Sequence, residues 1–164
     1  MEEILSATIT GIIGLITGTV GFYFANSYLE KKRESLSSKR EQLKYVYGPL
    51  EINMRTSRQE FERYFEKNTT FDEKVFIEKQ IWFPIHSETK RILMEESHYL
   101  NEIPEELLKL LEHINVWLSE YDLIYVKEKK NPPVFAGTKG YPYPKEADEY
   151  VFKKASELRS ALNL

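Results

Sequence analysis

The longest run of hydrophobic positions lies at the start of the chain. No Asp, Glu, Lys or Arg occurs from Ile4 to Leu29, a run of 26 residues. A helix of that length measures about 39 Å at ~1.5 Å per residue, which is enough to cross a hydrocarbon core of about 30 Å. A cleaved signal peptide would begin with positive charge, whereas Glu2 and Glu3 precede this run. We therefore predict an uncleaved transmembrane anchor over residues 1–29.

The charges that flank this segment predict its orientation. Six basic residues follow it within a short distance: Lys31, Lys32, Arg33, Lys39, Arg40 and Lys44. Positive charge accumulates on the cytoplasmic side of a membrane. We expect a single-pass protein of the cell inner membrane, with its N-terminus outside and its C-terminal region in the cytoplasm.

Small residues form a stripe along one face of the predicted anchor. They recur at spacings of 4, 3, 4, 3 and 4: Ala7, Gly11, Gly14, Gly18, Gly21 and Ala25. At ~100° per residue they fall within about 40° of one line along a helix. Such stripes let helix backbones approach closely in a bilayer, so we predict a homo-oligomer that associates through this face. Thr10 and Thr17 flank the stripe, where they could form hydrogen bonds between helices or line a pore.

Large apolar residues continue the same line beyond the anchor. They follow at intervals of seven and then of four, seven and four: Leu29, Leu36, Leu43, Leu50, Met54, Phe61 and Phe65. We predict a membrane-proximal helix over residues 30–67, with a break at Gly48-Pro49. Its apolar face fits either a coiled-coil stalk or packing against the cytoplasmic domain.

The pattern of residues 68–164 predicts a cytoplasmic bundle of helices. Thr70 and Glu73 form a capping box at the start of one helix, which Pro84 divides from the next. Pro104 precedes a helix, and the last helix begins near Pro144. The predicted fold class is all-α, with a single N-terminal transmembrane helix that continues into the bundle.

Two details of this bundle follow from the spacing of its apolar residues. The helix after Pro104 is expected to bury a face made of Leu107, Leu108, Leu111, Ile114, Leu118 and Tyr121. A short strand over residues 124–126 is an alternative to helix at that point.

A loop of 18 residues, 127–144, separates the last two helices and is longer than usual. It combines lysines with aromatic rings, and we treat these as a candidate anion-binding set: Lys127, Lys129, Lys130, Lys139, Tyr141 and Tyr143. The alternative is a solvated loop whose rings pack back onto the bundle.

Composition narrows the range of functions. The chain has no cysteine, so it lacks disulfides, cysteine nucleophiles and thiolate-held metal centres. A net charge of −3 and a pI near 5.7 argue against binding of double-stranded nucleic acid. Glu95 and His98 have the spacing of half a di-iron motif, but no second Glu-x-x-His completes it. We expect no enzyme activity, no metal and no cofactor.

Two functions remain as hypotheses. The first is a self-associating membrane protein that presents a cytoplasmic interaction or sensor domain to a protein partner or small anionic ligand. The second is a ligand-gated, pore-forming or membrane-disrupting effector. In architecture alone, the chain resembles small membrane effectors of bacterial nucleotide-signalled immunity, and this resemblance implies a role in antiphage defence.

Overall fold

The computed structural model describes residues 23–129 and 142–164, and their regular structure is helical throughout. No strand occurs in these two ranges, so the predicted all-α class is confirmed for them. The chain divides into two compact units, residues 1–38 and 39–164. In the first unit, residues 23–38 are α-helical, and Tyr23, Phe24 and Tyr28 are largely exposed there.

The predicted membrane anchor falls mostly on residues 1–22, which lie outside the described residues. Within the described ranges, no helix is both long enough and apolar enough to cross a membrane. The anchor therefore stays a prediction.

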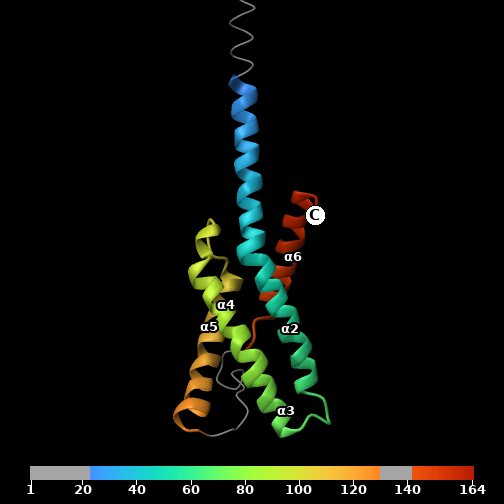
Figure 1. Cartoon of the computed structure of the whole chain (residues 1–164), viewed down its shortest axis with the longest axis vertical. Helices are drawn as coiled ribbons and strands as arrows, with labels where there is room; N and C mark the ends of the chain where they lie inside the picture. The colour runs from blue at the N-terminus through green and yellow to red at the C-terminus, as the bar shows by residue number, and fades with distance from the viewer. Residues whose placement is uncertain (1–22, 130–141) are drawn as a thin grey trace, which may run out of the picture. The chain divides into compact units, whose positions relative to one another are not determined.

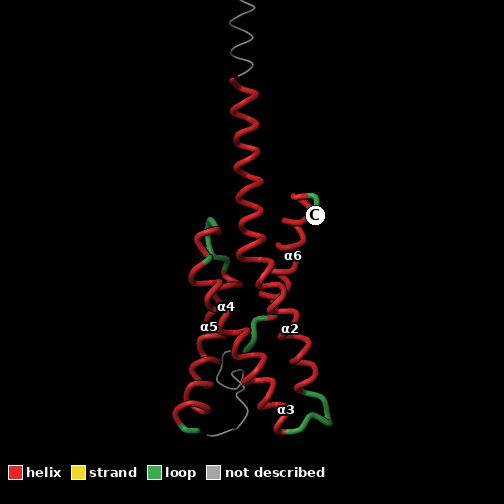
Figure 2. The backbone as a smooth tube through the Cα atoms, viewed as in Figure 1, coloured by secondary structure: helices red, strands yellow, loops and turns green. Residues whose placement is uncertain are grey.

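The second unit is a bundle of helical segments that alternate in direction (Figures 1 and 2). After residues 39–41, its elements are η1 (Gln42–Tyr47), α2 (Gly48–Tyr64), α3 (Phe71–Phe76), η2 (Ile77–Trp82), α4 (Phe83–Glu95), η3 (Ser97–Tyr99), α5 (Glu105–Tyr121), η4 (Asp122–Lys127) and α6 (Lys145–Leu162). Helix α2 contacts both α4 and α6, and α5 contacts the same two helices. The four long helices thus enclose a common core.

The core is built from residues of all four long helices. Leu50 and Met54 of α2 are buried in it, and Leu43 packs against it. This part of the apolar line predicted from the sequence therefore packs within the bundle. Phe61 and Phe65 at the far end of α2 are about half exposed.

Helix α5 buries a different face from the one predicted. Its buried residues are Leu107, Leu110, His113, Ile114 and Trp117, whereas Leu108 is 44% exposed. The prediction selected leucines by type, but the buried line includes a histidine and a tryptophan at the same helical spacing. Leu110 and Trp117 were missed, and the expectation that Leu108 is buried was wrong.

The prolines expected to interrupt helices instead follow π-helical turns. Pro49 comes directly after η1 and Gly48, and Pro84 comes directly after η2 and Phe83. In both places the residue before proline donates its backbone N–H to a carbonyl five residues earlier: Gly48 to Leu43 and Phe83 to Glu78. The wider turn accommodates a residue that has no N–H and whose ring would clash in a regular α-helix. The helical backbone therefore continues through both prolines.

The predicted starts of three helices are confirmed. Thr70 and Glu73 form the capping box of α3, in which each side chain accepts a hydrogen bond from the other's backbone N–H. Pro104 and Pro144 are the N-caps of α5 and α6. The alternative of a strand over residues 124–126 was wrong, because these residues belong to the π-helix η4.

Gly48 provides a test of the π turn. A Cβ atom at this position would lie 2.6 Å from the carbonyl oxygen of Leu43, which is far inside van der Waals contact. We expect Gly48→Ala to destabilise the protein by about 1–3 kcal/mol, measured by thermal or denaturant unfolding. The sign is diagnostic, because an ordinary helical Gly→Ala change stabilises.

The exposed α6 position Ser160 serves as the control, since Ser160→Ala should change stability by less than about 0.5 kcal/mol. Equal or greater stability of Gly48→Ala would contradict the π-turn geometry.

Candidate functional site

Three carboxylate side chains are buried in the described part of the chain: Glu51, Glu78 and Asp148. A buried carboxylate is expensive unless cations or hydrogen-bond donors compensate for its lost hydration. The partners of each one therefore indicate whether it serves the fold alone or is available to a ligand.

Glu51 is compensated by two arginines. Arg55, one turn further along α2, donates to Oε1 at 2.9 Å, and Arg159 of α6 donates to Oε2. The hydrogen bond from Arg159 is the main reason that the pKa of Glu51 is lowered, and burial opposes this shift. This ion pair ties α2 to α6.

Glu78 is compensated by tyrosine hydroxyls. Tyr64 donates to Oε1 at 2.8 Å and Tyr125 donates to Oε2 at 2.6 Å. Burial, together with the charge of Glu78, raises the pKa of both tyrosines, so they remain protonated donors. Glu78 thereby joins α2, η2 and η4.

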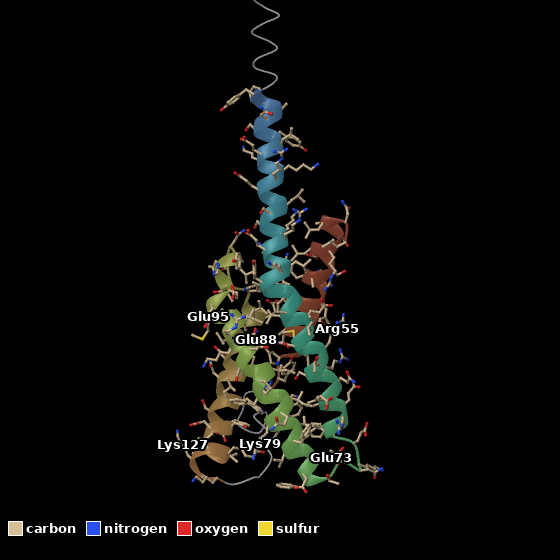
Figure 3. All side chains as sticks on the ribbon, in the orientation of Figure 1. Arg55, Glu73, Lys79, Glu88, Glu95 and Lys127 are labelled. Carbon is tan, nitrogen blue, oxygen red and sulfur yellow. The ribbon has the colours of Figure 1, made fainter. Side chains whose placement is uncertain are left out.

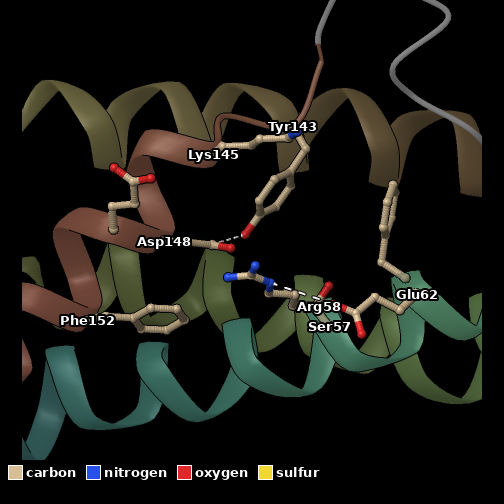
Figure 4. A pocket seen from close by; sticks show the side chains of 9 residues that line it. Ser57, Arg58, Glu62, Tyr143, Lys145, Asp148 and Phe152 are labelled. Carbon is tan, nitrogen blue, oxygen red and sulfur yellow. Dashed lines mark hydrogen bonds and ion pairs between the residues drawn. The ribbon is translucent and has the colours of Figure 1, made fainter.

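Asp148 differs from both. It is 8% exposed and accepts one hydrogen bond, from the Tyr143 hydroxyl (Figure 4). No Lys, Arg or His nitrogen of the described residues lies within 4.0 Å of its carboxylate. Burial raises the pKa of Asp148, and the Tyr143 hydrogen bond and the charge of Arg58 oppose this only in part.

A cavity of about 350 Å³ lies beside Asp148, between α2 and the start of α6. Its lining residues are Ser57, Arg58, Phe61, Glu62, Tyr143, Lys145, Asp148, Glu149 and Phe152. Most of the lining is apolar, and Asp148 is its only buried charge. The volume is in the range of small-molecule sites.

The other charged groups of the cavity are exposed. Arg58 faces Asp148 and Tyr143 in Figure 4, but its ion pair is with Glu62, at 4.0 Å between Nε and Oε1. Both of these side chains are more than 60% exposed. An exposed pair at that distance contributes little, so the Arg58 guanidinium can turn toward a ligand at small cost.

A histidine lies behind the cavity. His86 lines a void of about 10 Å³ that shares Ser57 and Tyr143 with the larger cavity. Burial, with a smaller effect of His113, lowers the pKa of His86 to about 3, so this imidazole is neutral at physiological pH. Its Nδ1 atom has no hydrogen-bond partner in the described part of the molecule.

The residues of the predicted anion-binding loop have separate positions. Lys127 lies at the end of η4 and pairs with Asp122 at 2.9 Å (Figure 3). Lys129 has a positive φ of 53°. Tyr143 lines the cavity and donates to Asp148. Lys130, Lys139 and Tyr141 lie outside the described residues.

The other predicted positions are mostly outside the described ranges. Of the stripe and its flanking threonines only Ala25 is described, and it is exposed on its helix; the rest are Ala7, Thr10, Gly11, Gly14, Thr17, Gly18 and Gly21. The isolated pair Glu95 and His98 makes a local contact, in which His98 Nδ1 lies 2.8 Å from the Glu95 carbonyl oxygen. No group of three or more possible metal ligands occurs among the described residues.

The sequence analysis missed Asp148, Arg58 and Phe152. One signal was present: the buried face of α6 contains Asp148, Val151, Ala155 and Leu158, at spacings of 3, 4 and 3. An acidic residue in such a line indicates either a partnered core charge or a site. No local pattern marks Arg58, because it reaches the cavity from another helix.

Comparisons with known proteins give no assignment. No family model matches the chain, and no curated protein or solved structure matches it. A function for this protein is therefore inferred from its sequence pattern and from the arrangement of the cavity.

We expect Glu51→Gln to lower stability by about 1–2 kcal/mol at pH 7, because the Gln cannot replace the charge that both arginines contact. The lowered pKa of Glu51 means that its stabilising effect is present above the ordinary glutamate range and is lost as the pH falls through the lowered value. The difference from wild type, followed by denaturant unfolding, should therefore shrink in acid. A difference that is independent of pH would exclude the ion pair as its cause.

We expect the opposite sign for Asp148→Asn, because Asn removes the desolvation of an ionised group that has no ion pair with the described residues. Stability at pH 7 should rise by up to about 1 kcal/mol. The raised pKa means that wild type loses stability as the pH increases through the window above the ordinary aspartate range, so the gain should vanish in acid. The exposed Glu146→Gln on the same helix is the control, and a loss at pH 7 larger than that of Glu146→Gln would contradict this assignment.

Proposed function

We propose that this protein is a single-pass protein of the cell inner membrane that self-associates through its N-terminal helix and presents a cytoplasmic helical sensor domain. Residues 4–29 would cross the bilayer with the N-terminus outside, and the bundle would lie in the cytoplasm. The observation that carries this proposal is the charge-free run of 26 residues with its stripe of small residues.

The bundle supports the sensor part of this proposal. It contains a cavity of ligand size, with a buried carboxylate that no cation of the described residues pairs with. Carboxylates kept in this state cost stability, and proteins tend to retain such groups where they contact a ligand.

We propose binding at this cavity rather than catalysis. Burial and the charge of Asp148 raise the pKa of Tyr143 well above its ordinary value, so its hydroxyl keeps its proton. A protonated hydroxyl that donates to Asp148 orients the carboxylate and is a poor nucleophile.

The second candidate is a ligand-gated pore or membrane-disrupting effector, as in antiphage defence. The observation in its favour is the position of Thr10 and Thr17 beside the small-residue stripe. In a ring of helices, these hydroxyls could face a water-filled path. Dye release from vesicles that contain the full-length protein would favour this function, and intact vesicles would favour the sensor alone.

Cysteine crosslinking in membranes tests the association, and the chain has no native thiol that would interfere. We expect Ala7→Cys and Ala25→Cys, on the stripe, to form disulfide-linked dimers several-fold more efficiently than Ile9→Cys and Ile16→Cys on the opposite face. These alanine positions are chosen because cysteine enlarges them less than it would enlarge a glycine. Equal crosslinking on both faces would contradict association through the stripe.

A further inference from the structure

The contact between α2 and α6 contains two buried carboxylates with different surroundings. Glu51 of α2 is held by Arg55 and by Arg159. Asp148 of α6 has one hydroxyl donor and no ion pair with the described residues. A carboxylate beside a cavity can recover its lost interactions from a ligand that brings a cation or an N–H donor.

The position of Arg58 adds a second requirement. Its guanidinium faces the same cavity and is committed only to an exposed pair at 4.0 Å (Figure 4). A ligand that carries only negative charge would place it beside Asp148, and a ligand that carries only positive charge would place it beside Arg58 and Lys145. A ligand with both charges satisfies both groups.

The apolar part of the lining adds a third requirement. Phe61 of α2 and Phe152 of α6 line the cavity, and Arg55 lies 4.6 Å from the ring centroid of Phe152. This pairing orients the Phe152 ring on α6. The volume of about 350 Å³ leaves room for an aromatic or large aliphatic group.

We propose that the cavity between α2 and α6 binds a small zwitterion with an apolar body, which is the chemistry of an α-amino acid with a large side chain. Its ammonium group bonds to Asp148, its carboxylate bonds to Arg58, and its body lies against Phe61 and Phe152. The proposal names the ligand class of the sensor domain and rests on the proposed function in that respect alone.

The ligand would connect two helices. Arg58 and Phe61 belong to α2, whereas Asp148 and Phe152 belong to α6. Because these contacts form only when the two helices are packed, the bound state should resist unfolding more than the free state.

Three matched probes test the charges separately on the full-length protein in lipid nanodiscs. L-phenylalanine carries both groups, phenethylamine lacks the carboxylate, and 3-phenylpropionate lacks the ammonium. We expect L-phenylalanine to bind at least about tenfold more tightly than either single-charge analogue, measured by equilibrium dialysis against empty nanodiscs. A thermal shift with saturating L-phenylalanine provides a second readout.

Two variants locate the site. Asp148→Asn should weaken L-phenylalanine binding by about tenfold or more and leave 3-phenylpropionate unaffected. Arg58→Gln should weaken binding of L-phenylalanine and 3-phenylpropionate but not of phenethylamine. The exposed α6 residues Glu146 and Lys153 lie outside the lining, so Glu146→Gln and Lys153→Gln should bind as wild type does.

Several outcomes would overturn the proposal. These are equal affinity for all three probes, no binding up to millimolar concentration, and wild-type binding by Asp148→Asn. Binding of AMP that depends on Arg58 but not on Asp148 would instead identify an anion site. Stripe-specific crosslinking together with any of these results would refute the ligand class and leave self-association standing, whereas the reverse pattern would refute the association alone.

Discussion

The interaction on which the bundle depends is the ion pair between Glu51 and Arg159, because it joins the first long helix of the bundle to the last. Glu51 is buried and receives arginine donors from both helices. Since α2 also contacts α4, and α6 also contacts α5, fixing α2 against α6 closes the ring around the core. The cavity lies in this same contact, so its shape is set by the pairing of these two helices.

The bundle treats its buried carboxylates in different ways. Cations neutralise Glu51, and tyrosine hydroxyls satisfy Glu78 from two directions. Asp148 receives one hydroxyl and lines an open cavity. A position that lowers stability without completing a network is the kind of exception to good packing that functional sites contain.

The sequence predicted the helical class and the helix starts well, because these depend on local signals. Thr70 with Glu73, Pro104 and Pro144 each act within one turn of a helix. It predicted the site poorly. Asp148 carries a weak signal as an acid on a buried line, but the contribution of Arg58 depends on how two helices distant in sequence pack, and no local spacing records that.

The π turns also determine where the helices can change register. A π turn resembles a dislocation in a crystal, since it holds one extra residue and can in principle move along the helix. Pro49 and Pro84 pin two of these defects, because a turn that moved past a proline would meet its missing N–H. The turn in η4 is followed by Glu128, which has an N–H. Slippage is therefore confined to the end of α5, while α2 and α4 transmit displacement as rigid rods.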